Sequence, residues 1–173
     1  YADTGELVSL ACALQADPDN SRDLFVSFGD VIFKKYVLDL LSEQDDDLVI
    51  AVDTEWKDSA NRGRAADYVR CSEAHSRNDF YSRIILEQAA ENIPENNIHG
   101  EWMGLLLVKA AGLPRFRQVV QEMAAESDYR RAKLYHLLSE LVRGGRQIRV
   151  VYTTGHWLDV DSLEDVVKAA RFT

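Results

Sequence analysis

Cysteine is scarce in this sequence, and long apolar runs are missing. Two of the 173 residues are cysteines, Cys12 and Cys71, and they form no CxxC pair. Two cysteines are too few for a disulfide framework, so we expect a reduced, cytoplasmic setting. The longest apolar stretch, Met103 to Val108, has the length of a strand, whereas crossing a bilayer takes roughly 20 residues. The sequence therefore predicts no membrane span, and no segment of it reads as a signal peptide.

Positive charge is also in short supply. The chain carries 20 lysines and arginines against 29 aspartates and glutamates, which gives a net charge of -9. Non-specific binding of nucleic acid needs a basic face, so we expect no nucleic-acid partner. Nucleotides stay possible, because a bound metal ion can supply the local positive charge. With 46% hydrophobic residues, the chain has the balance of an ordinary soluble domain.

The spacing of the apolar residues predicts an α/β fold in one domain, 1–173. Leu48–Val52 is almost wholly apolar, which is typical of a strand buried on both faces of a parallel sheet. Because strands alternate with helices, we expect a mixed, mostly parallel central sheet flanked by helices, with right-handed crossovers. Strand-like runs occupy 24–28, 48–52, 67–71, 98–108 and 147–152, and helical spacing occupies 5–16, 31–42, 113–125, 131–142 and a last segment from 161 or 162 to 172.

Asp30 stands where an open α/β sheet binds its ligands. The strand-like run 24–28 leads into Gly29, which permits a tight backbone bend, and then into Asp30. This places a carboxylate just beyond the carboxyl end of a strand. The alternative is that Asp30 caps a helix that begins near Val31.

Asp159 and Asp161 form a second acidic position, between the last strand and the last helix. In an extended segment, residues two apart project to the same face, so both carboxylates can reach one ion. Asp161 could instead cap the last helix in a capping box with Glu164, whereas Asp159 has no capping role. Together with Asp30, these acids make a plausible cage for a hard divalent cation, which takes oxygen ligands.

Four further residues could line a small-molecule site. Trp102 and Trp157 each follow a Gly-marked bend, and Glu101 and His156 directly precede them. Such residues can form the wall and the polar contacts of a pocket. Core packing for the tryptophans, an outward position for Glu101 and a structural role for His156 are the alternatives. No histidine pair has zinc spacing, and no Ser or Cys sits in a nucleophile elbow, so nothing indicates covalent catalysis.

These stretches resemble a known family. Ser27–Phe33 resembles the Gly-Asp motif of the sugar-phosphate nucleotidyltransferase superfamily, and Gly155–Asp165 resembles its terminal acidic motif. The pairing of Gly100–Leu105 with Thr154–Asp161 is similar to the cytidylyltransferase-type domain fused to phosphoenolpyruvate phosphomutase in phosphonate biosynthesis. Phosphocholine cytidylyltransferases are similar relatives. Tyr1–Leu10 matches the segment before the Gly-Asp strand, so the resemblance covers nearly the whole chain.

The resemblance implies a Rossmann-like nucleotidyltransferase fold and a reaction. An oxygen of a small phosphonate or phosphate acceptor would attack the α-phosphorus of CTP or another NTP, and pyrophosphate would leave. Mg²⁺ is the implied cofactor. The implied roles are catalysis for Asp30 and Asp159, metal binding for Asp30, Asp159 and Asp161, nucleotide binding for Thr4, Ser9 and Gly29, and substrate binding for Glu101, Trp102, His156 and Trp157.

One part of the family pattern has no counterpart. The family begins with a strand and a Gly-rich, basic loop that cradles the triphosphate, and nothing in the sequence matches it. We therefore expect 1–173 to be the C-terminal portion of the domain, inactive alone, with a sheet edge that a homodimer or another chain covers. Two other functions stay open, a non-catalytic or regulatory module and a metal-dependent phosphohydrolase that uses water as the acceptor.

Overall fold

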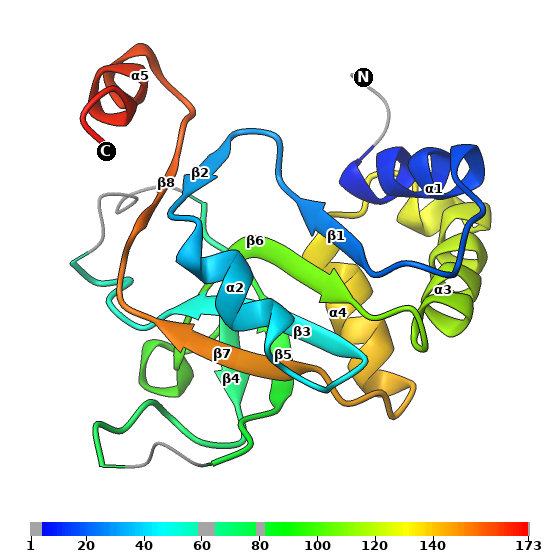
Figure 1. The fold of residues 1–173 in the computed structure, drawn as a ribbon, viewed down its shortest axis with the longest axis horizontal. Helices are drawn as coiled ribbons and strands as arrows, with labels where there is room; N and C mark the ends of the chain where they lie inside the picture. The colour runs from blue at the N-terminus through cyan, green and yellow to red at the C-terminus, as the bar shows by residue number, and fades with distance from the viewer. Residues whose placement is uncertain (1–4, 59–64, 79–81, 173) are drawn as a thin grey trace.

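A central sheet with helices on both faces makes up the molecule (Figure 1). The computed structural model describes residues 5–58, 65–78 and 82–172. The sheet has the strand order β5-β4-β6-β3-β7, with β1 also paired to β6, and β2 pairs separately with β8. The strands are β1 (Leu24–Ser27), β2 (Val31–Phe33), β3 (Leu48–Asp53), β4 (Tyr68–Cys71), β5 (Leu86–Ala90), β6 (Gly100–Val108), β7 (Arg149–Thr153) and β8 (Trp157–Asp159). The helices are α1 (Glu6–Ala16), α2 (Tyr36–Ser42), α3 (Leu113–Ala125), α4 (Leu134–Arg143) and α5 (Leu163–Ala169), with short 3-10 turns η1 (Glu95–Asn97) and η2 (Ser127–Tyr129).

The near-continuous apolar strand β3 is explained by burial on both of its faces. Leu48, Ile50 and Val52 point into a core formed with α1, α3 and α4. The alternate residues Val49 and Ala51 point into a second core with α2. Because side chains alternate along a strand, two apolar layers require an unbroken apolar sequence. The sequence pattern therefore reports the two layers of helices correctly.

The mixed α/β class is confirmed, but the sheet is not mostly parallel in the part of the chain described. The central strand β6 runs antiparallel to β1, β3 and β4, and β4 runs antiparallel to β5. Within the described residues, the parallel pair of the central sheet is β3 with β7. An apolar run indicates burial on both faces, whereas the chain connections set strand direction. Since β1 and β3 both oppose β6 and β7 follows β3, the carboxyl ends of β1, β3 and β7 face the same edge of the sheet.

The segment 31–42 differs from the single helix that its spacing predicts. Val31–Phe33 forms β2 and pairs with β8, and the helix α2 begins at Tyr36. The partner strand lies more than 120 residues away, so local periodicity carries no trace of this pairing. β5 was not predicted either, α4 begins three residues later than expected, and α5 is shorter than the predicted last helix. The predicted helices 5–16 and 113–125 agree closely with α1 and α3.

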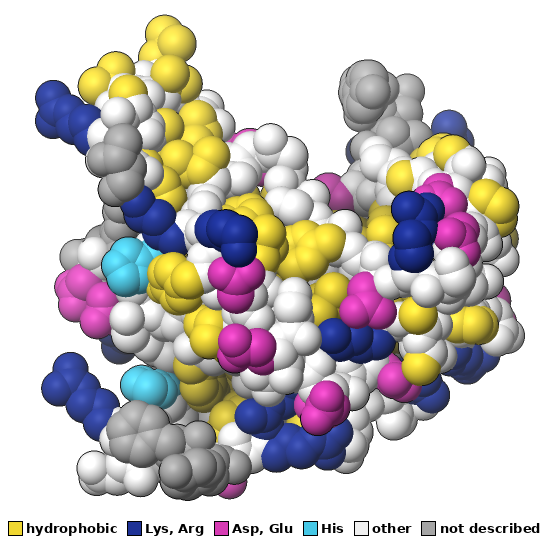
Figure 2. Space-filling view, in the orientation of Figure 1, with side chains coloured by type: hydrophobic (Ala, Val, Ile, Leu, Met, Phe, Trp, Pro, Cys, Tyr) yellow, Lys and Arg dark blue, Asp and Glu magenta, His cyan; other side chains and the backbone are white. Residues whose placement is uncertain are grey.

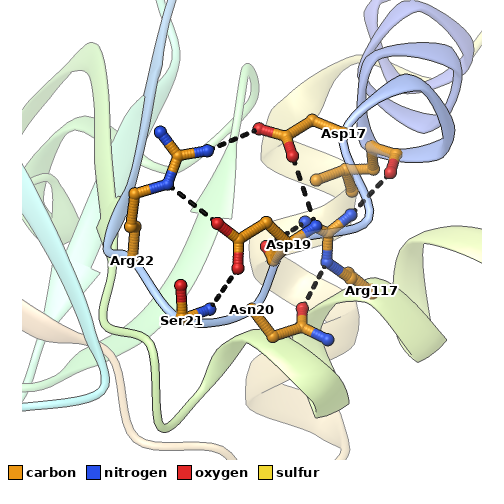
Figure 3. A network of polar contacts seen from close by, with 7 residues as sticks. Asp17, Asp19, Asn20, Ser21, Arg22 and Arg117 are labelled. Carbon is orange, nitrogen blue, oxygen red and sulfur yellow. Dashed lines mark hydrogen bonds and ion pairs between the residues drawn. The ribbon is translucent and has the colours of Figure 1, made fainter.

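Arg117 of α3 holds the loop that leads from α1 into β1 (Figure 3). Its guanidinium donates to the Leu14 carbonyl at 2.6 Å, to the Asn20 side chain at 2.7 Å and to the Asp19 carbonyl at 2.9 Å. On the outer side of the same loop, Arg22 pairs with Asp19 at 2.9 Å. The helix layer thus fixes the entry to β1, the strand that ends beside Asp30.

The last helix, α5, projects from the body and carries exposed apolar side chains (Figures 1 and 2). Leu163, Val166 and Val167 are 86%, 53% and 59% exposed. In Figure 2 the molecular outline is hollowed between α5 and α1. Among the described residues, no helix combines the length and the apolar character that a membrane span requires.

Candidate metal and substrate site

Three carboxylates converge beside the β2–β8 ladder. Asp30 follows β1 and Gly29, Asp159 ends β8, and Asp161 lies two residues further on. Each offers an oxygen, and the three oxygens lie within 4.8 Å of one another. The pairing of β2 with β8 brings the two acidic stretches together, since Val31 is opposite Asp159 and the Val160 N–H donates to the Asp30 carbonyl at 2.8 Å. The three aspartates singled out in the sequence are therefore neighbours in space.

Neither capping alternative for these aspartates holds in the structure. The residue after Asp30 begins the strand β2 and not a helix, so Asp30 has no helix to cap. The cap of α5 is Ser162, whose hydroxyl accepts from the Asp165 N–H in a capping box. Because Ser162 and Asp165 fill the capping positions, Asp161 is left to face Asp30 and Asp159.

A cavity of about 350 Å³ opens beside the three aspartates. Gly29, Glu101, Trp102 and Trp157 line it, as the sequence predicts for a common site. Ser9 lies instead in a neighbouring groove of about 410 Å³ between α1 and β1, which shares Glu6, Phe28 and Gly29 with the cavity. Thr4 lies outside the described residues.

His156 lies away from this cavity. It lines a separate hollow with Lys168, Arg171 and Phe172. Its Nδ1 atom is 2.6 Å from the Tyr36 hydroxyl, and its backbone has a φ of 65°, in the left-handed region. The structure therefore favours a positional role for His156 in the turn before β8. It places His156 with Trp157 in this second hollow, and not with Glu101 and Trp102 in the cavity beside the aspartates.

The two tryptophans both pack in the core and line the cavity. Trp102 is 2% exposed, its indole N–H donates to the Leu105 carbonyl at 3.0 Å, and the Phe28 ring meets it edge-on at 5.2 Å. The Trp157 indole N–H donates to Asp53 at 2.9 Å. Gly104, with a φ of 71°, leaves room for the Phe28 ring, which an added Cβ would meet at 2.2 Å. The Gly-marked bend near Trp102 thus shapes the aromatic wall.

Sequence reasoning missed a group of charged residues in the lining of the cavity. Glu6, Asp67 and Lys133 line it together with Glu101. Burial, reinforced mainly by the Glu6 carboxylate, raises the pKa of Asp67 to about 6. Lys133 forms an ion pair with Glu91, which raises the pKa of the lysine. Asp67 directly precedes β4, whose first residue pairs with Glu101. That juxtaposition depends on the register between strands 33 residues apart in the chain, so no local motif marks it.

Comparison with known proteins supports the fold. Neither a protein-family model nor a curated protein matches the sequence. The inositol-1-phosphate CTP transferase from T. maritima matches with a TM-score of 0.68 and 19% identity, over 98% of this chain and 61% of that one. A putative glucose-1-phosphate thymidylyltransferase from Bacillus anthracis matches with a TM-score of 0.65 and 11% identity, over 98% of this chain and 61% of that one. A nucleoside-diphosphate-sugar pyrophosphorylase from Vibrio cholerae matches with a TM-score of 0.60 and 14% identity, over 96% of this chain and 65% of that one.

The chain thus spans 61% to 65% of the length of these structures. Identities at this level carry information on fold, and not on substrate, because one fold hosts many functions. The chain shares the α/β fold of these structures, which confirms the expected fold class.

Proposed function

We propose that the protein takes part in Mg²⁺-dependent transfer of a nucleotidyl group, CMP from CTP, to a small phosphonate or phosphate, with release of pyrophosphate. The observation that supports this most strongly is the convergence of Asp30, Asp159 and Asp161 at the mouth of a cavity. Nucleotidyl transfer is also the chemistry that the names of the similar structures give, with CTP in one of them and phosphate-bearing acceptors in two.

The carboxylate set fits a small divalent cation. Oxygen donors are what Mg²⁺ prefers, and oxygens within 4.8 Å of one another can contact one ion after small side-chain rotations. When bound, Mg²⁺ would offset phosphate charge and hold the reacting groups in line. Asp30 directly precedes β2, and Asp159 lies in β8 opposite Val31. The β2–β8 ladder therefore fixes the separation of these two residues before any ligand enters.

The protein groups around the cation would position the substrates. An oxygen of the acceptor's phosphonate or phosphate forms the new bond to the α-phosphorus, and the bond to pyrophosphate breaks, so no protein nucleophile is needed. Trp102 and Trp157 form an aromatic wall beside this point. Lys133, which is paired with Glu91, would offer positive charge to the acceptor's phosphonate. We place the nucleotide over Gly29 and along the groove that holds Ser9, because that groove adjoins the cavity.

We further propose that 1–173 acts as the C-terminal portion of one nucleotidyltransferase domain. The chain covers 61% of each of two matched structures, so it corresponds to a part of such a structure. A phosphoenolpyruvate phosphomutase domain in the same polypeptide would supply a phosphonate acceptor. Assays therefore use the longest natural polypeptide that contains this sequence.

The reaction is tested by pyrophosphate release. The protein is incubated with CTP, ATP, GTP or UTP, Mg²⁺, and 2-hydroxyethylphosphonate, 2-aminoethylphosphonate or phosphocholine. We expect pyrophosphate only when an acceptor is present, and none with a chelator. Phosphate release without any acceptor would identify a phosphohydrolase instead. Nucleotide binding without turnover under every condition would favour the non-catalytic module.

A further inference from the structure

Asp53 is a fully buried acid that the proposed reaction does not use. It ends β3, has no exposed surface, and pairs with Glu101 of β6 and Thr153 of β7. Its Oδ1 atom accepts from the N–H groups of Glu55 and Gly155, each at 2.9 Å. Its Oδ2 atom accepts from the indole N–H of Trp157 at 2.9 Å. A buried acid is costly unless its oxygens are satisfied, and here three donors from two segments meet them.

Two of these hydrogen bonds hold the turn that leads to Asp159. The turn joins β7 to β8 and contains Gly155 and His156, each with a φ of 65°. A left-handed conformation at a residue with a side chain costs about 1–2 kcal/mol, so the turn needs support from outside. Asp53 supplies it at the backbone of Gly155 and at the side chain of Trp157, on either side of His156.

The strand that follows has little support of its own. β8 has three residues and pairs with β2, which also has three. A two-stranded ladder of this size is marginal in water. Along it, the Lys34 N–H donates to the His156 carbonyl at 3.0 Å, and Asp159 is opposite Val31. Asp53 links this ladder to the central sheet through Trp157, which begins β8.

We propose that Asp53 is a positioning residue for the metal site, acting through Gly155 and Trp157 on Asp159 and on the tryptophan wall of the cavity. This inference rests on the proposed function for its catalytic consequence. Groups that orient a metal ligand without touching the ion typically change metal affinity or activity by about 10–100-fold when they are altered.

The first test replaces Asp53 with Asn, which keeps the volume and places an amide beside donors that need an acceptor. Mn²⁺ titrated in place of Mg²⁺, without nucleotide, reports the affinity of the site. We expect Asp53→Asn to weaken Mn²⁺ binding about 10-fold or more. Amide exchange of Gly155 and Val160 should speed up, while exchange in β3 and β6 stays slow. Thr153→Val is the matched control, because Thr153 is also buried at the same edge and its hydroxyl contacts Met103. It should leave Mn²⁺ binding unchanged.

A second variant separates the hydrogen bond that holds Trp157 from the negative charge of Asp53. Trp157→Phe removes the indole donor and keeps the Asp53 carboxylate, so it should weaken Mn²⁺ binding in the same direction and by a smaller factor. It also serves if Asp53→Asn fails to fold. The double variant should bind no more weakly than Asp53→Asn alone. Unchanged amide exchange and unchanged Mn²⁺ affinity in both single variants would overturn the inference. If the wild-type protein binds no Mn²⁺ and amide exchange of Gly155 and Val160 is still faster in Asp53→Asn, the positioning role of Asp53 is supported and the metal site of the proposed function is rejected.

Discussion

The two ends of the central sheet use acidic residues in opposite ways. At the amino ends of β3 and β7 lies a cavity of about 830 Å³, where Asp46 pairs with Arg83, and Asp47 lies 3.9 Å from Arg146. At the carboxyl ends, the cavity is smaller, about 350 Å³, and three aspartates face one another within 4.8 Å. The larger hollow is lined by acids and arginines together, whereas the smaller one gathers three carboxylates at one point. Chemistry, and not volume, therefore distinguishes the candidate site.

The largest expected effect comes from removing a carboxylate of the candidate metal site. The same change at the opposite end of the sheet is its control. Asp30→Asn should lower pyrophosphate release at least 100-fold and abolish tight Mn²⁺ binding, because the site loses one of three anionic ligands. Asp46→Asn removes the same group at the opposite end and should change neither quantity. Equal losses in both variants, measured at matched folding by circular dichroism, would contradict the distinction between the two ends.

Glycine substitutions compare the packing of the two ends. Gly104 and Gly145 have φ values of 71° and 76°, so alanine is strained at both. An added Cβ at Gly104 would meet the Phe28 ring at 2.2 Å, whereas at Gly145 nothing lies within 4 Å. We expect Gly145→Ala to cost about 1 kcal/mol from strain alone and Gly104→Ala about 3 kcal/mol because overpacking is added. Urea denaturation measures both, and similar losses would show that the Phe28 ring yields freely.

The secondary structure was more predictable from the sequence than the pairings that build the site. The two-layer burial of β3 and the apolar stripes of α3 and α4 are local periodicities, and they identify these elements. Asp30, Asp159 and Asp161 were found because each stands near a strand end with a recognisable neighbour. Nothing local marks the β2–β8 ladder, because its strands are short and far apart in the chain. The register that brings Asp67 to Glu101 is hidden for the same reason.

Replacing Asp67 gives the next smaller effect. The contribution of Asp67 to stability falls as the pH rises, whereas that of an ion-paired acid grows. Burial raises its pKa to about 6 from 3.8, so the folded protein retains a proton that the unfolded chain releases. The resulting stabilisation is present below about pH 4 and is lost as the pH rises through about 6. Asp67→Asn cannot ionise and should raise the free energy of unfolding at pH 7 by about 2 kcal/mol. Urea denaturation at pH 4 to 7 with a chelator measures this. A variant that keeps the wild-type pH slope would show that other groups cause it.

The smallest effect is expected where opposite charges meet at the amino end of the sheet. Arg83 pairs with Asp46 and donates to the Gln147 side chain at 2.9 Å, yet its side chain is 54% exposed. An ion pair of this kind contributes about 0–1 kcal/mol, since water and salt screen it and two long side chains lose freedom. Arg83→Met should therefore change the free energy of unfolding by about 0.5 kcal/mol and leave Mn²⁺ binding intact. A loss of several kcal/mol in urea denaturation, or a weaker Mn²⁺ site, would mean that the two ends of the sheet are coupled. In that case the neutralised acids would take part in forming the site, and their pairing could not be treated as a separate surface feature.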